Sequence, residues 1–262
     1  MVAYSKMANV VITGASSGIG AALARLYAAQ GASLLLIGRD NARLKETAAA
    51  CRGAASVETA SIDVRDRAGI AGVLLDFDAR HALDVLVANA GITHILEPDA
   101  PVENTEEFQR VLETNLVGAF NTVAPVSERM AGRGHGRIGL VGSIAGLRGL
   151  PYSPAYCASK AGLKAMGEAM RAKLRPRGVS VTIASLGFVV TPLDAGIDSP
   201  KPLRMTAERA AARIAAAIAA GRAHVAFPLS LAAAARLLTL LPPRLGDALL
   251  RRIPVRPRNA GN

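Results

Sequence analysis

A tyrosine and a lysine four residues apart, Tyr156 and Lys160, are the side chains of this chain with the clearest chemical potential. On a helix they would lie on one face, one turn apart. A phenol in water titrates near ~10, and a positive charge within about 4–6 Å lowers its pKa. The hydroxyl of Ser143 could then hold a carbonyl or alcohol oxygen beside the tyrosine. The three side chains suit proton transfer to or from such an oxygen, although the Tyr-x-x-x-Lys spacing alone also fits a helix without chemistry.

The N-terminal segment has the pattern of a dinucleotide-binding unit. An apolar run at 9–13 is followed by the glycine-rich turn Gly14-Ala15-Ser16-Ser17-Gly18-Ile19-Gly20, a helical stretch at 21–30 and a second apolar run at 32–37. Strand, glycine turn, helix and strand within about 30 residues form a βαβ unit. Such a turn lets the backbone approach a pyrophosphate, and the N-terminus of the following helix favours anions. The sequence therefore predicts a nucleotide cofactor.

With these motifs in place, the chain resembles a short-chain dehydrogenase/reductase. The resemblance spans roughly residues 8–227, and its motifs follow one another in the family's order: Thr13 to Gly20, Asp63-Val64, Asn89-Ala90-Gly91, the tetrad of Asn115, Ser143, Tyr156 and Lys160, and finally Gly187 and Thr191. One departure is Leu186, where the family usually has a proline. A residue other than proline restores an N–H donor there. The resemblance therefore does not determine the detailed shape of the nicotinamide pocket.

The resemblance implies the roles of the site residues. Tyr156 would exchange a proton with the substrate oxygen, Ser143 would hold that oxygen, and Lys160 would lower the pKa of Tyr156 and bind the nicotinamide ribose. Asn115 would hold a water that links Lys160 to bulk solvent, and because asparagine inside a helix costs stability, we expect a local helix distortion there. The expected cofactor-binding residues are Gly14, Ser16, Ser17, Gly18, Ile19, Gly20, Arg39, Asp63, Val64, Asn89, Ala90, Gly91, Tyr156, Lys160, Gly187, Val189 and Thr191.

The end of the second expected strand bears on the choice of cofactor. Enzymes that use NAD place an acid there to hold the ribose 2′-hydroxyl, but in the family's pattern that position falls on Gly38. Arg39 follows and could meet a 2′-phosphate with its planar fork of donors, while Asp40 suits the N-cap of the next helix. NADP(H) is therefore the preferred cofactor. NAD(H) stays open, because Arg39 could instead only stack on adenine.

Strand-like and helix-like segments alternate along the chain, which predicts an α/β fold with a doubly wound, Rossmann-type parallel sheet. We expect about seven strands in the order 3-2-1-4-5-6-7, the seventh implied by the resemblance, with helices on both faces. The strands are expected at 9–13, 33–37, 56–61, 85–88, 137–141, 180–184 and 224–227, and the helices at 18–30, 41–51, 67–80, 105–130, 154–174 and 207–219. Residues 1–227 would form one NADP-binding catalytic domain with a substrate lid at about 188–205, and 228–262 a helical C-terminal extension.

Composition excludes several other functions. The formal charge is +11, but seven basic residues and one acid lie between Arg222 and the C-terminus, and no basic stripe with interleaved aromatics appears. We therefore expect no nucleic-acid partner. The four histidines lack metal-ligand spacing, so we expect no metal. Two cysteines and the absence of a signal-peptide pattern favour the cytoplasm.

The C-terminal extension is apolar and basic. Residues 229–241 are apolar almost all round, Pro242-Pro243 ends that segment, and 244–253 form an amphipathic helix candidate. Thirteen helical residues at 1.5 Å each cannot cross ~30 Å of hydrocarbon. An apolar face with flanking arginines suits peripheral contact with an anionic surface, here the inner membrane surface, through residues 229–258. The alternative is that the extension packs over the active site or on a partner subunit.

The resulting interpretation is an NADPH-dependent oxidoreductase that reduces a carbonyl to an alcohol, or runs the reverse reaction. The expected partner is a small-molecule carbonyl or alcohol substrate, fairly hydrophobic or acyl-type because apolar side chains surround the tyrosine. A sugar or polyketide ketoreductase is an alternative within this class. A non-catalytic NADP(H)-binding scaffold or sensor is the rival outside it. The resemblance also implies a homodimer or homotetramer.

Overall fold

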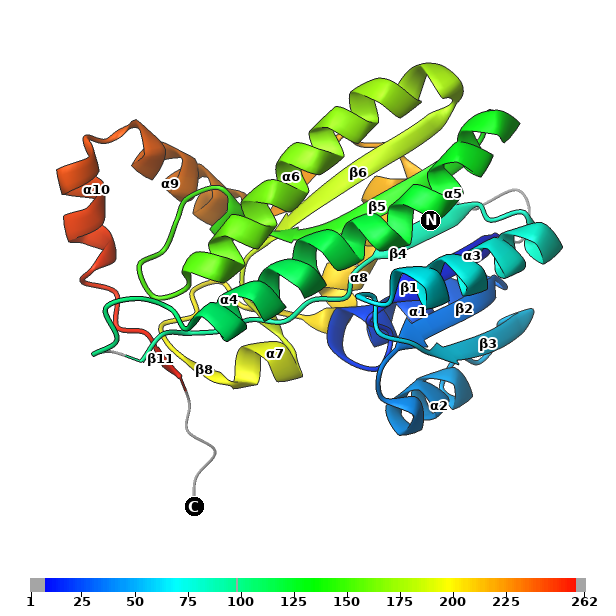
Figure 1. Ribbon diagram of the computed structural model, residues 1–262, viewed down its shortest axis with the longest axis horizontal. Coiled ribbons are helices and arrows are strands. Elements are labelled where there is room, and N and C mark those ends of the chain that lie inside the picture. The colour runs from blue at the N-terminus through cyan, green and yellow to red at the C-terminus, as the bar shows by residue number, and fades with distance from the viewer. Residues whose placement is uncertain (1–7, 98, 258–262) are drawn as a thin grey trace.

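A parallel seven-stranded sheet forms the centre of the protein, which we describe from a computed structural model covering residues 8–97 and 99–257 (Figure 1). The strand order is β3-β2-β1-β4-β5-β6-β10, and every neighbouring pair is parallel. This confirms the expected topology, with β10 as the seventh strand. The strands are β1 Asn9–Thr13, β2 Ser33–Gly38, β3 Ser56–Ser61, β4 Val85–Ala88, β5 Gly136–Ser143, β6 Val179–Leu186 and β10 His224–Phe227.

Helices cover both faces of the sheet because its central strands are apolar on both sides. In β1, Val10 and Ile12 belong to one buried cluster, and Val11 belongs to the other. The first cluster is closed by α1 Gly18–Ala28, α2 Asn41–Ala49 and α8 Ala207–Ala219; the second is closed by α3 Arg67–His81, α5 Gly118–Arg133 and α6 Pro154–Leu174. The carboxyl ends of the strands are left to form a site.

The long helix expected at 105–130 is interrupted at Asn115. It consists of α4 Thr105–Leu112, one π-helical turn at Glu113–Val117, and α5. Thr114 and Asn115 are buried inside the π turn. π turns inside α-helices are frequent at functional sites. The local distortion expected from an asparagine in a helix interior is therefore confirmed.

Short strands tie the segment at 188–205 to the C-terminal extension. Within the segment, β7 Val189–Val190 pairs with β9 Met205–Thr206, and α7 Pro192–Ala195 lies between them. The intervening β8 Ile197–Asp198 pairs with β11 Arg256–Pro257 near the end of the described chain. The extension also contains α9 Leu229–Leu240 and α10 Pro243–Leu250, close to the helices expected there. Among the described residues, no helix combines the length and apolar character that crossing a membrane requires.

Candidate active site

The glycine turn between β1 and α1 forms one end of the site. Gly14 and Gly18 adopt φ of +65° and +52°, in the left-handed region that favours glycine. A Cβ on Gly14 would also lie only 2.8 Å from Cα of Ala90. The side-chain amide of Asn89 fixes the turn by donating to the carbonyls of Thr13 and Gly14 at 3.0 and 3.1 Å. Ser17 gives α1 no side-chain cap, so the first N–H groups of this helix suit the pyrophosphate of a dinucleotide.

A cavity of about 830 Å³ extends from this turn past the tyrosine to the C-terminal helices. Nearly all of the expected cofactor-binding residues line it, as do Ser143, Tyr156 and Lys160. Gly20 and Asn115 do not line it. Gly20 instead packs under the turn, where a Cβ would lie 2.2 Å from the Gly14 carbonyl oxygen. Apart from these two, the residues that the motifs singled out surround one cavity that suits a dinucleotide.

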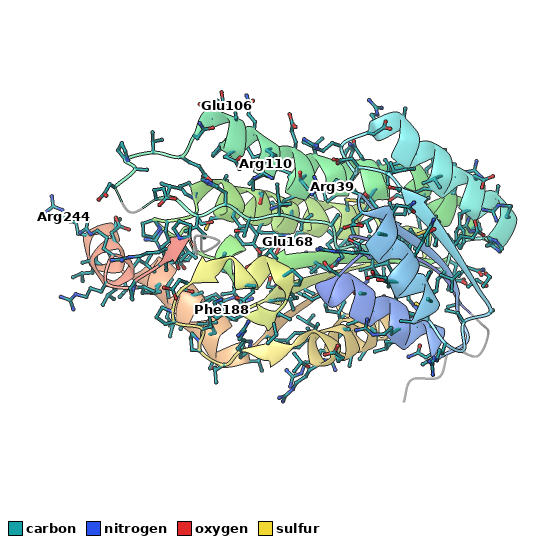
Figure 2. All side chains as sticks on the ribbon, turned by 90° about the horizontal axis from the view of Figure 1, so that it is seen from below. Arg39, Glu106, Arg110, Glu168, Phe188 and Arg244 are labelled. Carbon is teal, nitrogen blue, oxygen red and sulfur yellow. The ribbon has the colours of Figure 1, made fainter. Side chains whose placement is uncertain are left out.

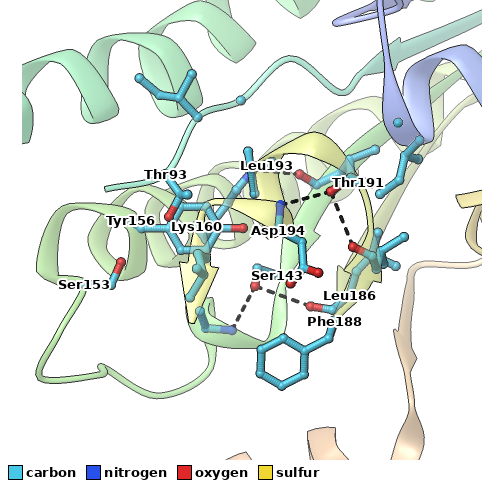
Figure 3. Close-up of a pocket in the computed structure, with 18 of the residues that line it drawn as sticks. Thr93, Ser143, Ser153, Tyr156, Lys160, Leu186, Phe188, Thr191, Leu193 and Asp194 are labelled. Atoms are coloured by element: carbon cyan, nitrogen blue, oxygen red, sulfur yellow. Dashed lines mark hydrogen bonds between the residues drawn. The ribbon is translucent and has the colours of Figure 1, made fainter. Parts of the chain in front are cut away.

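Ser143, Tyr156 and Lys160 meet on the wall of this cavity (Figure 3). Lys160 Nζ lies 5.7 Å from the centre of the Tyr156 ring and donates to the Val141 carbonyl at 3.0 Å. The Ser143 hydroxyl accepts from the Ala145 N–H at 3.1 Å and donates to the carbonyl of Leu186 at 3.3 Å. The residue that departs from the family's pattern is thus a direct partner of Ser143.

The electrostatics of the tyrosine differ from the expectation. Burial raises the pKa of Tyr156, and the hydrogen bond with Ser143 offsets this effect only in part. Lys160 is itself buried, and this desolvation lowers its pKa to about 8. The expected lowering of the tyrosine pKa is therefore wrong for this structure, because the loss of hydration on burial has the largest effect on the pKa of the phenol.

Asn115 acts on the loop that follows β4. Its Oδ1 accepts from the N–H of Ile92 at 2.8 Å, and its Nδ2 donates to the carbonyl of Ile92 at 2.9 Å and to Ser159 Oγ at 3.0 Å. The side chain thus joins this loop to helix α6, which carries Tyr156 and Lys160. It is a positioning residue in this structure, and its role in holding a water stays a prediction.

Two arginines line the cavity near the end of β2, and the sequence motifs indicated only Arg39 of the two. Asp40 caps α2 by accepting from the N–H of Arg43 at 3.0 Å, as expected. Arg43 lines the cavity wall, as Arg39 does. Asp63 also lines the cavity, where the hydrogen bonds from Arg65 hold the pKa of its carboxyl below the usual value. The sequence could have indicated Arg43, because it lies three residues after the predicted N-cap Asp40, in the first turn of the helix.

Apolar side chains enclose the other end of the cavity. The segment at 188–205 and helices α9 and α10 both contribute to this wall, with Phe188, Leu193, Leu231, Leu238, Leu250 and Ile253 among its residues. Asp194 fixes the segment through ion pairs with Lys201 at 3.3 Å and Arg204 at 2.6 Å. The alternative that the C-terminal extension packs over the site is therefore observed for the side of α9 and α10 that lines the cavity.

A feature that the motifs did not indicate is Glu103, a buried carboxylate that holds the amino end of α6. Its Oε2 accepts from the N–H of Ala155 at 2.7 Å, and its Oε1 lies 2.8 Å from His94 Nδ1. A carboxylate at a helix N-terminus satisfies an unpaired donor and interacts favourably with the helix dipole. Because Ala155 immediately precedes Tyr156, Glu103 is a positioning residue for the tyrosine.

Replacing Glu103 with alanine is expected to destabilise the protein and to slow turnover. Loss of the cap leaves buried partners unsatisfied, so the free energy of unfolding should fall by about 1–3 kcal/mol. We expect kcat to fall roughly tenfold, because small misplacements of catalytic groups are costly, with little change in cofactor KM. Glu103→Gln keeps an acceptor and should recover most of both losses. Glu106→Ala, at an exposed position three residues away, is the control, and equal behaviour of the two alanine variants would contradict the role.

The comparisons with known proteins agree with this geometry. A family model described as short chain dehydrogenase matches residues 8–202. An uncharacterized oxidoreductase of Myxococcus xanthus is 35% identical over 247 residues, which cover 94% of this chain and 97% of that protein. The chain belongs to the short-chain dehydrogenase/reductase family.

Two solved structures share the fold and differ in cofactor. A variant of actinorhodin polyketide ketoreductase with NADPH has a TM-score of 0.78 and 27% identity, covering 88% of this chain and 99% of that one. A short chain dehydrogenase from Mycobacterium paratuberculosis bound to NAD has a TM-score of 0.75 and 25% identity, covering 86% of this chain and 98% of that one. The family therefore makes this protein an NAD(P)-dependent oxidoreductase.

Proposed function

We propose that the protein is an NADPH-dependent oxidoreductase that interconverts a carbonyl and an alcohol at Tyr156. The observation that carries this proposal is that Ser143, Tyr156 and Lys160 meet on the wall of the same cavity that the glycine turn closes at its other end. Bound NADPH would supply the hydride. The residues of this chain hold the substrate oxygen with Ser143 and Tyr156, and Tyr156 donates the proton.

The preference for NADPH is supported by the adenosine end of the cavity. Gly38 offers no carboxylate for a ribose hydroxyl, and the guanidinium groups of Arg39 and Arg43 both line the wall. Guanidinium groups pair well with phosphate. Neither arginine is committed to a close buried partner, since Arg39 lies 3.8 Å from Asp63, Arg43 pairs with its neighbour Asp40, and both side chains are largely exposed.

Replacing Arg39 and Arg43 with alanine is expected to raise KM for NADPH by roughly tenfold or more for each arginine, since a charge-assisted hydrogen bond contributes about 1.5–3 kcal/mol. KM for NADH should change little. Arg175→Ala, at an exposed position beyond the far end of α6, is the matched control. An unchanged ratio of NADPH to NADH efficiency in the double variant would contradict the preference.

The reverse change offers a gain of function at the same place. A Cβ on Gly38 would lie 3.4 Å from its nearest neighbours, Leu44 Cδ2 and Ser16 Oγ, which is ordinary contact. Gly38→Asp should therefore fold normally. In the background without the two arginines, it should move the preference toward NADH by supplying the missing carboxylate.

The apolar end of the cavity supports a fairly hydrophobic or acyl-type substrate. A polyketide substrate stays an alternative, because one of the similar solved structures is a polyketide ketoreductase. A sugar fits less well, because it would find few polar partners in this part of the wall. A screen that follows NADPH absorbance against 3-oxoacyl, polyketide-like, steroid-like and sugar ketones tests the reaction and the substrate class together. A protein that binds NADPH but consumes none with any ketone would instead be the non-catalytic scaffold.

We further propose residues 1–227 as the catalytic domain, residues 228–262 as its extension, and a homodimer or homotetramer in the cytoplasm. Exposed Val117 and Phe120 lie on the π turn and α5, where a second copy could cover them. Cys51 and Cys157 are both buried and unpaired, which suits a reducing compartment.

A further inference from the structure

Helices α9 and α10 bury one side and expose leucines on the other. Leu231 and Leu238 of α9 and Leu250 of α10 line the cavity. On the outside, Leu240 is 79% exposed, Leu237 62% and Leu245 57%. We call the exposed set the C-terminal face, which consists of Leu237, Leu240, Leu241, Leu245 and Leu249. Single exposed apolar side chains are common on folded proteins, but a group of large ones usually marks a surface that binds a partner.

The segment that carries this face is rich in exposed arginines. All five arginines between residues 228 and 257 are exposed: Arg236, Arg244, Arg251, Arg252 and Arg256. Arg244 projects from the end of the molecule that α9 and α10 form (Figure 2). The single acid of this segment is Asp247, which pairs with Arg148 at 2.9 Å. The C-terminal face therefore combines exposed leucines with an excess of positive charge.

Charge selects among the partners that could cover these leucines. A second copy placed face to face would bring ten arginines together with only two acids, so like-charge repulsion would oppose the contact. A nucleic acid would pair with the arginines but leave the leucines in water. An anionic bilayer surface matches both features, because the leucines enter the boundary of the acyl chains while the arginines meet lipid phosphates.

We propose that the C-terminal face docks the protein on a bilayer surface that contains anionic lipids. Leu231 and Leu238 of α9 line the cavity, whereas Leu237 and Leu240 of the same helix face outward. One helix therefore separates the cavity from the docked lipid. The contact is peripheral, since neither α9 nor α10 is long enough to cross the hydrocarbon core.

The test is sedimentation of the full chain with vesicles. We expect binding to phosphatidylcholine vesicles that include phosphatidylglycerol, weaker binding at high salt, and little binding to pure phosphatidylcholine. The variant Arg244→Glu/Arg251→Glu/Arg252→Glu should lower the partition coefficient by about tenfold or more. Leu237→Ser/Leu240→Ser should lower it similarly by removing apolar contact.

Matched controls change the same residue types elsewhere on the surface. These are Arg175→Glu/Arg177→Glu at the far end of α6, and Val102→Ser at a valine that is 74% exposed. Both should bind the vesicles as the unchanged protein does. Thermal melting and NADPH binding verify that each variant is folded, and because no step depends on turnover, this test can fail while the reductase proposal stands.

Three outcomes would overturn the proposal. One is the absence of binding to anionic vesicles. Another is equal loss of binding in the C-terminal and control variants, which would show that total charge matters and the face does not. The third is sedimentation velocity in which Leu237→Ser/Leu240→Ser converts an oligomer to monomers without any vesicle binding, since the face would then belong to a second copy.

Discussion

The Tyr156→Phe protein is expected to reduce its carbonyl substrate roughly 10²–10⁴-fold more slowly, the range that general acid–base catalysis contributes. The change keeps the ring and removes only the hydroxyl. Because burial raises the pKa of Tyr156, the phenol holds its proton at neutral pH and can donate it as the alkoxide develops. Steady-state kcat, followed by NADPH absorbance, measures the loss.

Tyr152 supplies the matched control. It lines the same cavity four residues before Tyr156, and burial raises its pKa to about 12. Tyr152→Phe removes the same hydroxyl from the same wall, yet it should change kcat only severalfold, because Lys160 and Ser143 are arranged around Tyr156. The melting temperature should stay unchanged in both variants. Near-normal turnover in Tyr156→Phe, or an equal loss in Tyr152→Phe, would show that Tyr156 is not the proton donor.

The parts of the site that the sequence predicts are those that local spacing determines. The four-residue spacing of Tyr156 and Lys160 places them together on a helix wherever that helix lies. The order of strand, glycine turn and helix similarly determines where a pyrophosphate can bind. The helix distortion at Asn115 was also predictable from local sequence. An asparagine lowers the stability of a helix interior wherever that helix lies, and this local effect predicted the distortion.

The missed features depend on contacts between distant segments. Glu103 meets Ala155 across 52 residues, and the stretch before Glu103 has no periodicity that would place it. The pairing of β8 with β11 joins two-residue strands about 58 positions apart, too short to leave a pattern in the sequence. The sign of the Tyr156 pKa shift was missed for a related reason, because spacing reveals a neighbouring charge but not how completely the pair is buried.

The Lys160→Met protein is expected to be more stable than the unchanged protein at neutral pH and nearly inactive. Burial lowers the pKa of Lys160 from an ordinary 10.5 to about 8. At about 1.4 kcal/mol for each pKa unit, holding the charged form below pH 8 costs on the order of 3 kcal/mol. Methionine fills a similar volume without that cost but leaves the Val141 carbonyl without its donor, a loss of about 1–2 kcal/mol. The net gain is about 1–2 kcal/mol, measured by chemical unfolding.

The dependence on pH distinguishes this cause from a change in packing. Between the folded pKa near 8 and the unfolded value of 10.5, the unfolded chain binds the proton more tightly, so the stability of the unchanged protein rises with pH. The advantage of Lys160→Met should therefore shrink through this window and reverse above it, where only the lost hydrogen bond remains. Lys164→Met, one turn further along α6 at an ion pair with Glu168, should show no such change. The prediction is contradicted if the stability difference between the two proteins stays constant with pH, or if Lys160→Met is the less stable protein at neutral pH. Either result would mean that the buried charge of Lys160 does not lower stability at the site where the proposed reaction needs it.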